Sequence, residues 1–340
     1  MADLMFVTED GASHRPAYQN AMRDIDVIER VTLVDPTGAT FGETEAVIGS
    51  KATIRESTIE AALAKCHPAM AIVTMKAAHA PDVIRPLLDS GIHVMAEKPA
   101  CVNVSEFTEL TKLAQDRGVH LMLALANRLR PAIADARQII SEGGIGHIYA
   151  IRATQVDDQT RIQRRLNDPD WTFQKNMAGG GHLSWLGIHT IDMMRFLTGL
   201  EIEEVAAMTP VVGGAPIDVE DLATVIMRFS GGAHGMLFSG YLMPEKGHSG
   251  FVLYGSQGWI RYNASEEGKL EWRSVDEPMR VTSYGNHDSG YTPWVEQTLS
   301  ACVGDCAPPI TAADGLAALQ VVHAAYHASE SRTTIRLNQA

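Results

Sequence analysis

The sequence has few cysteines, a shortage of basic residues and no long apolar run, and each shortage excludes a class of protein. Four cysteines among 340 residues are too few and too scattered for the disulfide framework of a small secreted domain. Lys and Arg number 28 against 41 Asp and Glu, and the net charge of -13 would repel a nucleic-acid backbone. No apolar run approaches the roughly 20 residues that span a bilayer. We therefore expect a cytoplasmic protein with neither a nucleic-acid nor a membrane partner.

The length and the apolar content favour two globular domains. At 340 residues the chain exceeds the size at which one hydrophobic core usually keeps growing. Hydrophobic residues make up 45% of it, which is ample apolar material to bury. No repeat and no Pro/Ser-rich linker separates the halves. We expect domains at 1–126 and 127–340, with a ligand cleft between them.

The first domain alternates short β-branched runs with helical segments, which predicts parallel strands joined by crossover helices. Ser105 is the expected N-cap of one helix, and Gly118 is expected to end it. The expected helices include 80–90 and 105–117. The expected strands are 4–8, 30–34, 70–74, 93–96 and 120–124. This pattern is typical of a doubly wound, Rossmann-type α/β domain.

The second domain has a different pattern. A long helix is expected from 128 to about 141, followed by a glycine-rich turn at 143–146 and a strand at 148–155. Further segments of alternating apolar residues predict an open, mostly antiparallel sheet in an α+β domain. These segments are 203–208, 223–229, 235–240 and 250–254.

A lysine follows directly after an apolar strand in Glu97-Lys98-Pro99. Ligands of open α/β sheets bind at the carboxyl ends of strands, which puts Lys98 at the ligand crevice. A lysine there can hydrogen-bond a substrate hydroxyl and stabilise the alkoxide that develops as hydride leaves. A surface turn is the simpler interpretation of an isolated Glu-Lys-Pro, so the assignment depends on the rest of the chain.

Three glycines, 179–181, run into a helix that is expected to end before Gly199. They let the start of this helix approach another backbone or a ligand closely. His189 is its best general base, because the ordinary pKa of imidazole lies near neutrality. A core or surface role is the alternative for a lone histidine. At 100° per residue, one stripe of the helix carries five side chains: His182, Trp185, His189, Asp192 and Phe196.

The order of these motifs resembles the Gfo/Idh/MocA oxidoreductases, the family of glucose-fructose oxidoreductase and inositol dehydrogenase. TMKAAH, EKP, Arg128 with GGIGHI, and GGG with GIHTID follow one another in family order. The similarity continues through DVEDLATVIMRFSGGAHGML and YGSQGWIRY to PITAADGLAALQVVHAAYHAS and covers nearly the whole chain. The resemblance implies an N-terminal Rossmann domain that binds a nicotinamide cofactor. It also implies a sugar or polyol substrate, and a C-terminal sheet that supports homodimers or homotetramers.

The dinucleotide loop departs from the family pattern. The family loop is GxGxxG, whose glycines let backbone amides cradle the pyrophosphate. Here only Gly11 remains, while Glu9 and Asp10 bring negative charge toward the pyrophosphate. The cofactor is NAD or NADP, and NAD is favoured if Asp35 binds the ribose diol; a turn role before Pro36 is the alternative. The implied cofactor contacts are Gly11, Ser13, His14, Asp35, Thr74, His79, Glu97 and Lys98.

By resemblance, Lys98 and His189 occupy the positions that handle the substrate hydroxyl proton, and we expect both to be catalytic. Trp185 stands where many relatives have an aspartate, and its indole offers a platform for a sugar face or fills the core. Asp192 either orients His189 or serves a structural role. The candidate substrate contacts are Trp185, His182, Asp192, Asp157, Arg161 and Trp171. Asp157, His182, His189 and His287 carry groups that suit a divalent metal, but no spacing defines a site, and we predict no metal.

Three functional classes remain open. The leading prediction is an NAD(P)-dependent oxidoreductase that oxidises a secondary hydroxyl of a sugar, inositol or related polyol, or reduces the ketone. The altered loop motivates a second class, a non-redox lyase, hydratase or epimerase that acts on an oxidised sugar in the same cleft. The third is a non-catalytic ligand-binding member. The presence of both Lys98 and His189 favours the catalytic classes.

Overall fold

A computed structural model describes residues 2–165, 171–285 and 290–337. The chain forms two compact units. The first contains Met1–Ala126, Asn176–Gly179 and Ser289–Leu316, and the second contains Asn127–Lys175, Gly180–Asp288 and Ala317–Ala340. The chain therefore returns to the first unit twice after Ala126.

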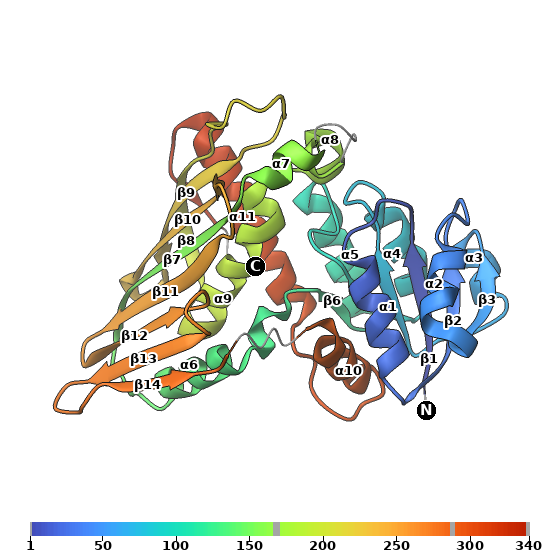
Figure 1. Ribbon diagram of the computed structural model, residues 1–340, viewed down its shortest axis with the longest axis horizontal. Helices are drawn as coiled ribbons and strands as arrows, with labels where there is room; N and C mark the ends of the chain where they lie inside the picture. The colour runs from blue at the N-terminus through green and yellow to red at the C-terminus, as the bar shows by residue number, and fades with distance from the viewer. Residues whose placement is uncertain (1, 166–170, 286–289, 338–340) are drawn as a thin grey trace. The chain divides into compact units, whose positions relative to one another are not determined.

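The first unit is built on a sheet of six strands in the order β3-β2-β1-β4-β5-β6. All neighbouring pairs are parallel. The strands are β1 (Ala2–Thr8), β2 (Ile28–Val34), β3 (Ala52–Glu56), β4 (Met70–Thr74), β5 (His93–Ala96) and β6 (Leu121–Leu123). Figure 1 shows β1, β2 and β3 side by side in the blue part of the chain. The order reverses between β1 and β4, as in the Rossmann fold, and confirms the predicted fold class of this unit.

Burial explains which of these strands the sequence reveals. All five residues of β4 are buried, and so are six of the seven in β1, as expected for parallel strands covered on both faces. Their continuous apolar runs make them easy to recognise. The edge strand β3 was not predicted, because its partly exposed residues alternate in burial and Ile54 is its only large apolar side chain.

The helices of the first unit largely match the prediction, apart from one cap. They are α1 (Arg15–Asp24), α2 (Phe41–Ile48), α3 (Ile59–Leu63), α4 (Ala80–Asp89), α5 (Val104–Arg117) and α10 (Tyr291–Cys302), with a short turn η1 (Gly49–Lys51). Asn103, not Ser105, is the N-cap of α5, and it forms a capping box with Glu106. Ser105 is therefore a first-turn residue, and its prediction as the cap was wrong. Gly118 ends the helix in the left-handed conformation, as predicted.

The second unit contains a sheet of nine strands in the order β14-β13-β12-β11-β7-β10-β9-β8-β15. The β7–β10 pair is parallel and the other pairs are antiparallel, which confirms the predicted mostly antiparallel sheet. The strands are β7 (Ile148–Asp158), β8 (Ile202–Met208), β9 (Leu222–Phe229), β10 (His234–Met243), β11 (His248–Gly255), β12 (Gly258–Asn263), β13 (Lys269–Ser274), β14 (Arg280–Ser283) and β15 (Ile335–Arg336).

The other described helices and turns are η2 (Ala126–Leu129), α6 (Pro131–Ser141), α7 (Thr160–Arg165), η3 (Trp171–Phe173), α8 (Lys175–Ala178), η4 (Leu183–Gly187), α9 (Ile188–Thr198), η5 (Ser230–Gly232) and α11 (Ala312–Ser331). The predicted continuous helix from 128 was wrong. Arg130 has extended backbone between η2 and α6, because the ring of Pro131 disfavours a helical conformation in the preceding residue.

One face of the nine-stranded sheet is covered and the other exposes apolar side chains. Helices α6 and α9 lie on the same face (Figure 1). On the opposite face Ile226, Met236 and Tyr254 are 54%, 37% and 44% exposed, and Ile226 pairs with Met236 across β9 and β10. Among the described helices, none has the length and apolar character of a membrane span.

Candidate functional site

The loop after β1 joins the strand to α1 at the carboxyl end of the first sheet. Gly11 has a φ of 74°, and His14 adopts the left-handed conformation just before α1. The Thr74 hydroxyl, at the end of β4, donates a 2.5 Å hydrogen bond to the Ser13 carbonyl. The loop therefore lies between the ends of β1 and β4, where the strand order reverses and where ligands of this fold bind.

Glu9 does not leave an uncompensated charge in this loop. Its carboxylate accepts a 2.7 Å hydrogen bond from the Lys76 backbone N–H, lies 2.9 Å from His79 Nδ1 and lies 3.7 Å from Lys76 Nζ. Asp10 is exposed, 3.9 Å from Arg15 Nη1. The negative charge expected to oppose a pyrophosphate is thus largely directed into the loop after β4.

The residues of this loop fit a dinucleotide. The Thr8 hydroxyl is buried at the end of β1 and has no hydrogen-bond partner within the described residues. Gly11 supplies the positive φ of a tight turn, and the N-terminal end of α1 follows, which favours an anion. Lys76 adds a positive charge, with its Cε 3.7 Å from a Cβ built on Gly11. Thr8, the first turn of α1 and Lys76 are the groups that would hold the pyrophosphate.

Asp35 follows β2 and is fully buried. One carboxylate oxygen accepts hydrogen bonds from the backbone and side chain of Thr37, and the other accepts both from Thr40, at 2.7–2.9 Å. These bonds outweigh the effect of burial and lower the pKa of Asp35. A carboxylate has about four acceptor positions, and all four serve this turn. The geometry favours the turn role of Asp35 over a ribose contact.

Glu97 joins α1 to the lysine after β5. Its carboxylate accepts a 2.5 Å hydrogen bond from the Tyr18 hydroxyl, lies 3.3 Å from His14 Nδ1 and lies 4.0 Å from Lys98 Nζ. Burial would raise the pKa of Glu97, but His14, Lys98 and Tyr18 more than offset it and hold the pKa at about 2. Lys98 is itself buried. The pair is therefore an ionised carboxylate beside a lysine at the carboxyl end of β5.

In the second unit, the glycines before η4 make room for protein atoms. A Cβ on Gly180 would lie 2.1 Å from the Tyr326 hydroxyl, and one on Gly181 would lie 1.9 Å from the Glu220 carbonyl. The Glu220 carboxylate accepts hydrogen bonds from the N–H groups of Gly181 and Leu183, both at 2.7 Å, and from Tyr326 at 3.1 Å. Burial dominates here and raises the pKa of Glu220 to about 7. Of the two expected uses of these glycines, the structure supports close approach to protein.

The helix that carries His189 is not regular. η4 is a π-helical turn that precedes α9. The single spacing of 100° per residue therefore does not hold from His182 to Phe196. Wide turns of this kind are frequent at functional sites. His189 is half-buried in the first turn of α9.

His182 and Asp157 form a buried hydrogen-bonded group. His182 Nδ1 lies 2.7 Å from the Ser239 hydroxyl, and Nε2 lies 3.2 Å from Asp157 Oδ2. Burial alone would raise the pKa of Asp157, but hydrogen bonds from His182 and Gln155 and the charge of Arg161 lower it. Asp157, His182 and Arg161 are thus brought together as candidate substrate contacts.

The remaining candidate substrate contacts of the second unit, Asp192, Trp185 and Trp171, are engaged in two side-chain interactions. Asp192 accepts two hydrogen bonds from the Arg128 guanidinium, at 2.6 and 2.8 Å, in a buried ion pair. This geometry favours a structural role for Asp192. Trp185 and Trp171 pack edge to face with ring centroids 5.4 Å apart and are both buried. His287 lies outside the described residues.

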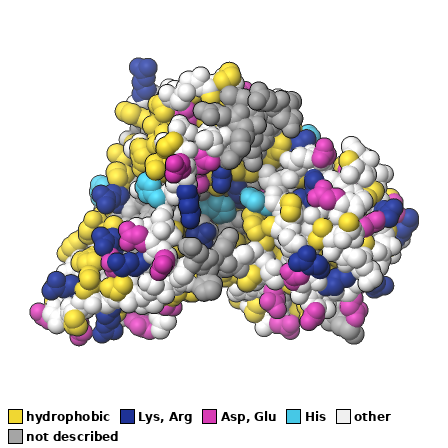
Figure 2. All heavy atoms as spheres, viewed as in Figure 1, with side chains coloured by type: hydrophobic (Ala, Val, Ile, Leu, Met, Phe, Trp, Pro, Cys, Tyr) yellow, Lys and Arg dark blue, Asp and Glu magenta, His cyan; other side chains and the backbone are white. Residues whose placement is uncertain are grey.

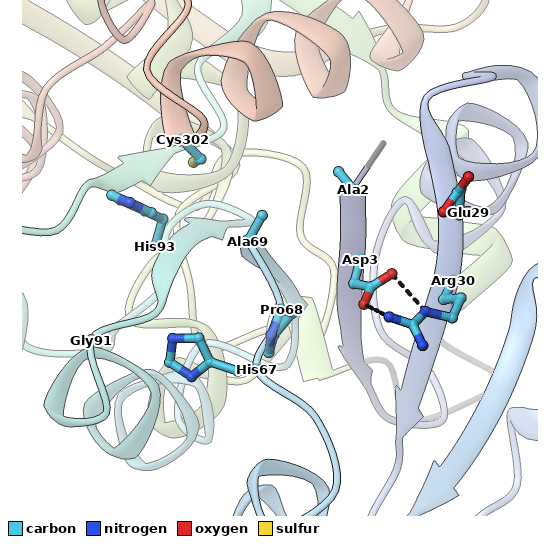
Figure 3. Close-up of a pocket in the computed structure, with 10 residues that line it drawn as sticks. All are labelled: Ala2, Asp3, Glu29, Arg30, His67, Pro68, Ala69, Gly91, His93 and Cys302. Carbon is cyan, nitrogen blue, oxygen red and sulfur yellow. Dashed lines mark hydrogen bonds and ion pairs between the residues drawn. The ribbon is translucent and has the colours of Figure 1, made fainter.

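Each unit contains a pocket lined by its own described residues. Arg161 and Asp157 line one of about 630 Å³ in the second unit. Figure 3 shows one of about 440 Å³ in the first unit, at the amino ends of the strands. There the Asp3 carboxylate accepts a 2.8 Å hydrogen bond from Arg30. Because ligands of this fold bind at the opposite end of the sheet, the pocket in Figure 3 is not the expected dinucleotide site.

Family models match both units. Residues 10–125 match the model described as the oxidoreductase family, NAD-binding Rossmann fold, and residues 133–261 match the GFO/IDH/MocA C-terminal domain. The chain belongs to the Gfo/Idh/MocA family. Its first unit is the NAD-binding Rossmann domain of this oxidoreductase family. The family resemblance seen in the sequence is confirmed.

Several curated relatives are named dehydrogenases. Levoglucosan dehydrogenase of Pseudarthrobacter phenanthrenivorans is 29% identical over 206 residues, 54% of this chain and 52% of the relative. Trans-1,2-dihydrobenzene-1,2-diol dehydrogenase of Mus musculus is 32% identical over 164 residues, 48% of this chain and 46% of the relative. The chain spans about half the length of the curated relatives it matches.

Solved structures of the family share the whole fold. A levoglucosan dehydrogenase in complex with NADH and L-sorbose has a TM-score of 0.86 at 21% identity, with 100% of both chains covered. The WlbA dehydrogenase of Bordetella pertussis, in complex with NADH and UDP-GlcNAcA, has a TM-score of 0.85 at 19% identity and 99% coverage of both chains. At these identities the likeness establishes the fold of this Gfo/Idh/MocA member.

Sequence reasoning missed several groups that form these sites. Tyr18 lies four residues after His14, a helical spacing that could have linked the two. Glu220 and Tyr326 had no local signal, because they meet Leu183 and Ser184 from 37 and 142 residues away. Arg130 and Lys246 also line the pocket of Arg161, and neither belongs to a recognisable motif.

Metal-ligand clusters and disulfides are absent from the described part of the chain. No group of three or more His, Cys, Asp or Glu side chains there is arranged to hold a metal ion. All four cysteines are free thiols. Burial raises the pKa of Cys302 to about 12, and Cys306 adds to the shift. Neither thiol is set up as a metal ligand by this geometry.

Proposed function

We propose that this Gfo/Idh/MocA member is an NAD-dependent dehydrogenase that oxidises a secondary hydroxyl of a sugar, inositol or related polyol, or reduces the ketone. The observation that carries the proposal is the Glu97–Lys98 pair at the carboxyl end of β5 in an NAD-binding Rossmann domain. Relatives named as dehydrogenases of levoglucosan and of a dihydrodiol support this substrate class.

NAD, when bound, supplies the hydride acceptor. Thr8, the start of α1 and Lys76 hold the pyrophosphate, and Gly11, Ser13 and His14 shape the loop. NAD is preferred over NADP because the solved relatives described above carry NADH. The preference does not depend on Asp35, whose carboxylate oxygens serve its own turn.

Lys98 positions the substrate hydroxyl and, by stabilising the developing alkoxide, helps its proton to pass to His189 as hydride leaves. The ionised Glu97 carboxylate lies 4.0 Å from Lys98 Nζ, and an ammonium at this position stabilises a developing alkoxide. His189, half-buried at the start of α9, relays the proton. Trp185 and Trp171 offer an apolar surface for a sugar face.

Calorimetric titration with NAD, NADH, NADP and NADPH, followed by a polyol panel, tests the proposal. Binding of NAD and its reduction by a polyol are expected. Lys98→Met should lower kcat by about 100-fold or more, because it removes the ammonium that stabilises the alkoxide, while the Kd for NAD changes far less. Lys112→Met, on the exposed side of α5, is the matched control and should leave both unchanged.

Absence of binding to all four nucleotides would overturn the proposal and favour the non-redox lyase, hydratase or epimerase, for which the altered loop is the supporting observation. Unchanged turnover in Lys98→Met would remove the lysine from the mechanism.

We also propose that two or four copies assemble through the exposed face of the nine-stranded sheet. Ile226, Met236 and Tyr254 make this face apolar, and contiguous apolar surface of this kind marks an interaction site. Light scattering after chromatography measures the assembly, and a monomer at micromolar concentration would contradict it.

A further inference from the structure

Basic side chains converge on the 630 Å³ pocket of the second unit. Arg130 comes from the residue before α6, Arg161 from α7, and Lys246 from the segment before β11, with the imidazole of His248 beside them. Within the described residues, none of these four side chains makes a hydrogen bond or an ion pair. Figure 2 shows acidic and basic side chains intermixed over much of the drawn face.

The two carboxylates of the pocket are already engaged by neighbouring groups. Asp157 accepts a 2.7 Å hydrogen bond from Gln155 and lies 3.2 Å from His182 Nε2. Asp158 accepts 2.7 Å hydrogen bonds from the backbone and side chain of Thr160. The long-range charge of Arg161 acts on Asp157, but no direct ion pair joins any described basic side chain of the pocket to either acid.

The charges of the pocket do not balance. Among the described lining residues, two arginines and one lysine face two carboxylates, which leaves one positive charge before His248 is counted. A neutral sugar would gain little from such a surplus, whereas a single carboxylate would complete it. Arginine binds carboxylates through two parallel hydrogen bonds, so two arginines with no described partner suit a carboxylate in particular.

The pocket adjoins the helix of His189. A small enclosed cavity shares Arg130, Gln155 and Tyr262 with the pocket and reaches Thr190 and Met193 on α9. Thr190 is the residue after His189. This cavity of about 20 Å³ holds about one water molecule, so it links the lining of the pocket to the start of α9 without admitting a sugar.

We propose that the substrate is a sugar acid and that Arg130 and Arg161 bind its carboxylate. The inference rests on the proposed function for the reacting hydroxyl of that sugar. It adds that the substrate carries one negative charge. The expected substrates are therefore uronates and aldonates, and neutral sugars and polyols are not.

The test compares each acid with its neutral counterpart by calorimetry on the full chain, with and without saturating NAD. The pairs are D-glucuronate with D-glucose, D-galacturonate with D-galactose, and D-gluconate with D-sorbitol, and D-glucose 6-phosphate is added to separate phosphate from carboxylate. At least one acid should bind about ten-fold or more tightly than its counterpart. No preference for any acid, or tighter binding of the phosphate, would overturn the inference.

Variants assign the carboxylate contact. Arg161→Gln and Arg130→Gln should each raise the Kd for the acid about ten-fold, with little change for the neutral sugar, and Arg161→Lys should recover part of the loss. The control is Arg273→Gln on β13, an exposed arginine whose side chain makes no hydrogen bond or ion pair to a described residue. An equal loss in the control, or none in either pocket variant, would overturn the assignment. Melting curves identify variants that fail to fold.

The two proposals fail separately. Binding of an acid without binding of NAD would reject the dehydrogenase and keep the sugar-acid pocket. Binding of NAD and oxidation of neutral polyols without preference for an acid would keep the dehydrogenase and reject the sugar-acid pocket.

Discussion

Glu97 in the first unit and Glu220 in the second are both buried, at 3% and 6% exposure. Their pKa values nevertheless shift in opposite directions. Burial raises the pKa of both. Around Glu97, His14 and Lys98 reverse the effect and hold the pKa at about 2. Glu220 has only neutral hydrogen-bond donors among its main partners, and its pKa is about 7. The difference between the two glutamates follows from their neighbours, because Glu97 has Lys98 and His14 beside it and Glu220 has no basic side chain among its main partners.

The difference matches the different work of the two sites. Glu97 stays ionised beside Lys98, the side chain that we propose stabilises the developing alkoxide. Glu220 binds the N–H groups of Gly181 and Leu183 at the start of the helix that carries His189. Because its pKa is about 7, Glu220 gains or loses a proton near neutral pH. The proposed reaction gives it no role.

The largest expected effect comes from removing the charge of Glu97. Glu97→Gln should lower the free energy of unfolding by about 3–5 kcal/mol at pH 7, because Lys98 is left as a buried, uncompensated charge. The folded pKa lies below the unfolded value, so this stability is present above pH 4.5 and is lost as the pH falls through 2. Urea denaturation at pH 7 and pH 3 measures it.

The matched control is Glu296→Gln on the exposed side of α10. The difference between wild type and Glu97→Gln should shrink by about 2 kcal/mol between pH 5 and pH 3. A difference independent of pH would mean that lost packing, not charge, explains the variant.

Glu220→Gln tests a pH dependence of stability opposite to that of Glu97. The folded pKa of about 7 lies above the ordinary value of 4.5, so the contribution of Glu220 is fully present below pH 4.5 and is lost as the pH rises through 7. Wild type should lose up to about 3 kcal/mol of unfolding free energy between pH 4.5 and pH 8 relative to Glu220→Gln. Parallel curves for the two proteins over this range would contradict the raised pKa.

The smallest expected effect is the difference in stability between the Tyr18→Phe and Tyr326→Phe variants. Tyr18 donates to Glu97 and Tyr326 donates to Glu220. Each Phe variant should lower stability by about 1 kcal/mol at pH 7. Tyr18→Phe should cost more than Tyr326→Phe, because a hydrogen bond to a charged acceptor is the stronger one. Thermal denaturation at pH 7 compares them, and a larger loss in Tyr326→Phe would reverse the interpretation.

The fold was largely predictable where burial is continuous. β4 and β5 occupy the predicted residues, and β1 differs only by an earlier start. β3 escaped prediction because an edge strand carries little apolar signal. The candidate site was predictable only as a set of residues: the position of Lys98 after a strand is a local property, whereas the turn role of Asp35 depends on where Thr37 and Thr40 direct their hydroxyls.

The sequence by itself determined the Rossmann-type pattern, the family resemblance and the candidate residues, because periodicity and motif order are properties of neighbouring positions. The tertiary structure alone decided which of those residues are already engaged with protein partners. It brought Glu220 to Gly181, 39 residues away, and turned Glu9 toward His79. It also gathered Arg130, Arg161 and Lys246 around one pocket. Charge balance at a site depends on distances in space, and the chain encodes those only through the packing of the whole unit.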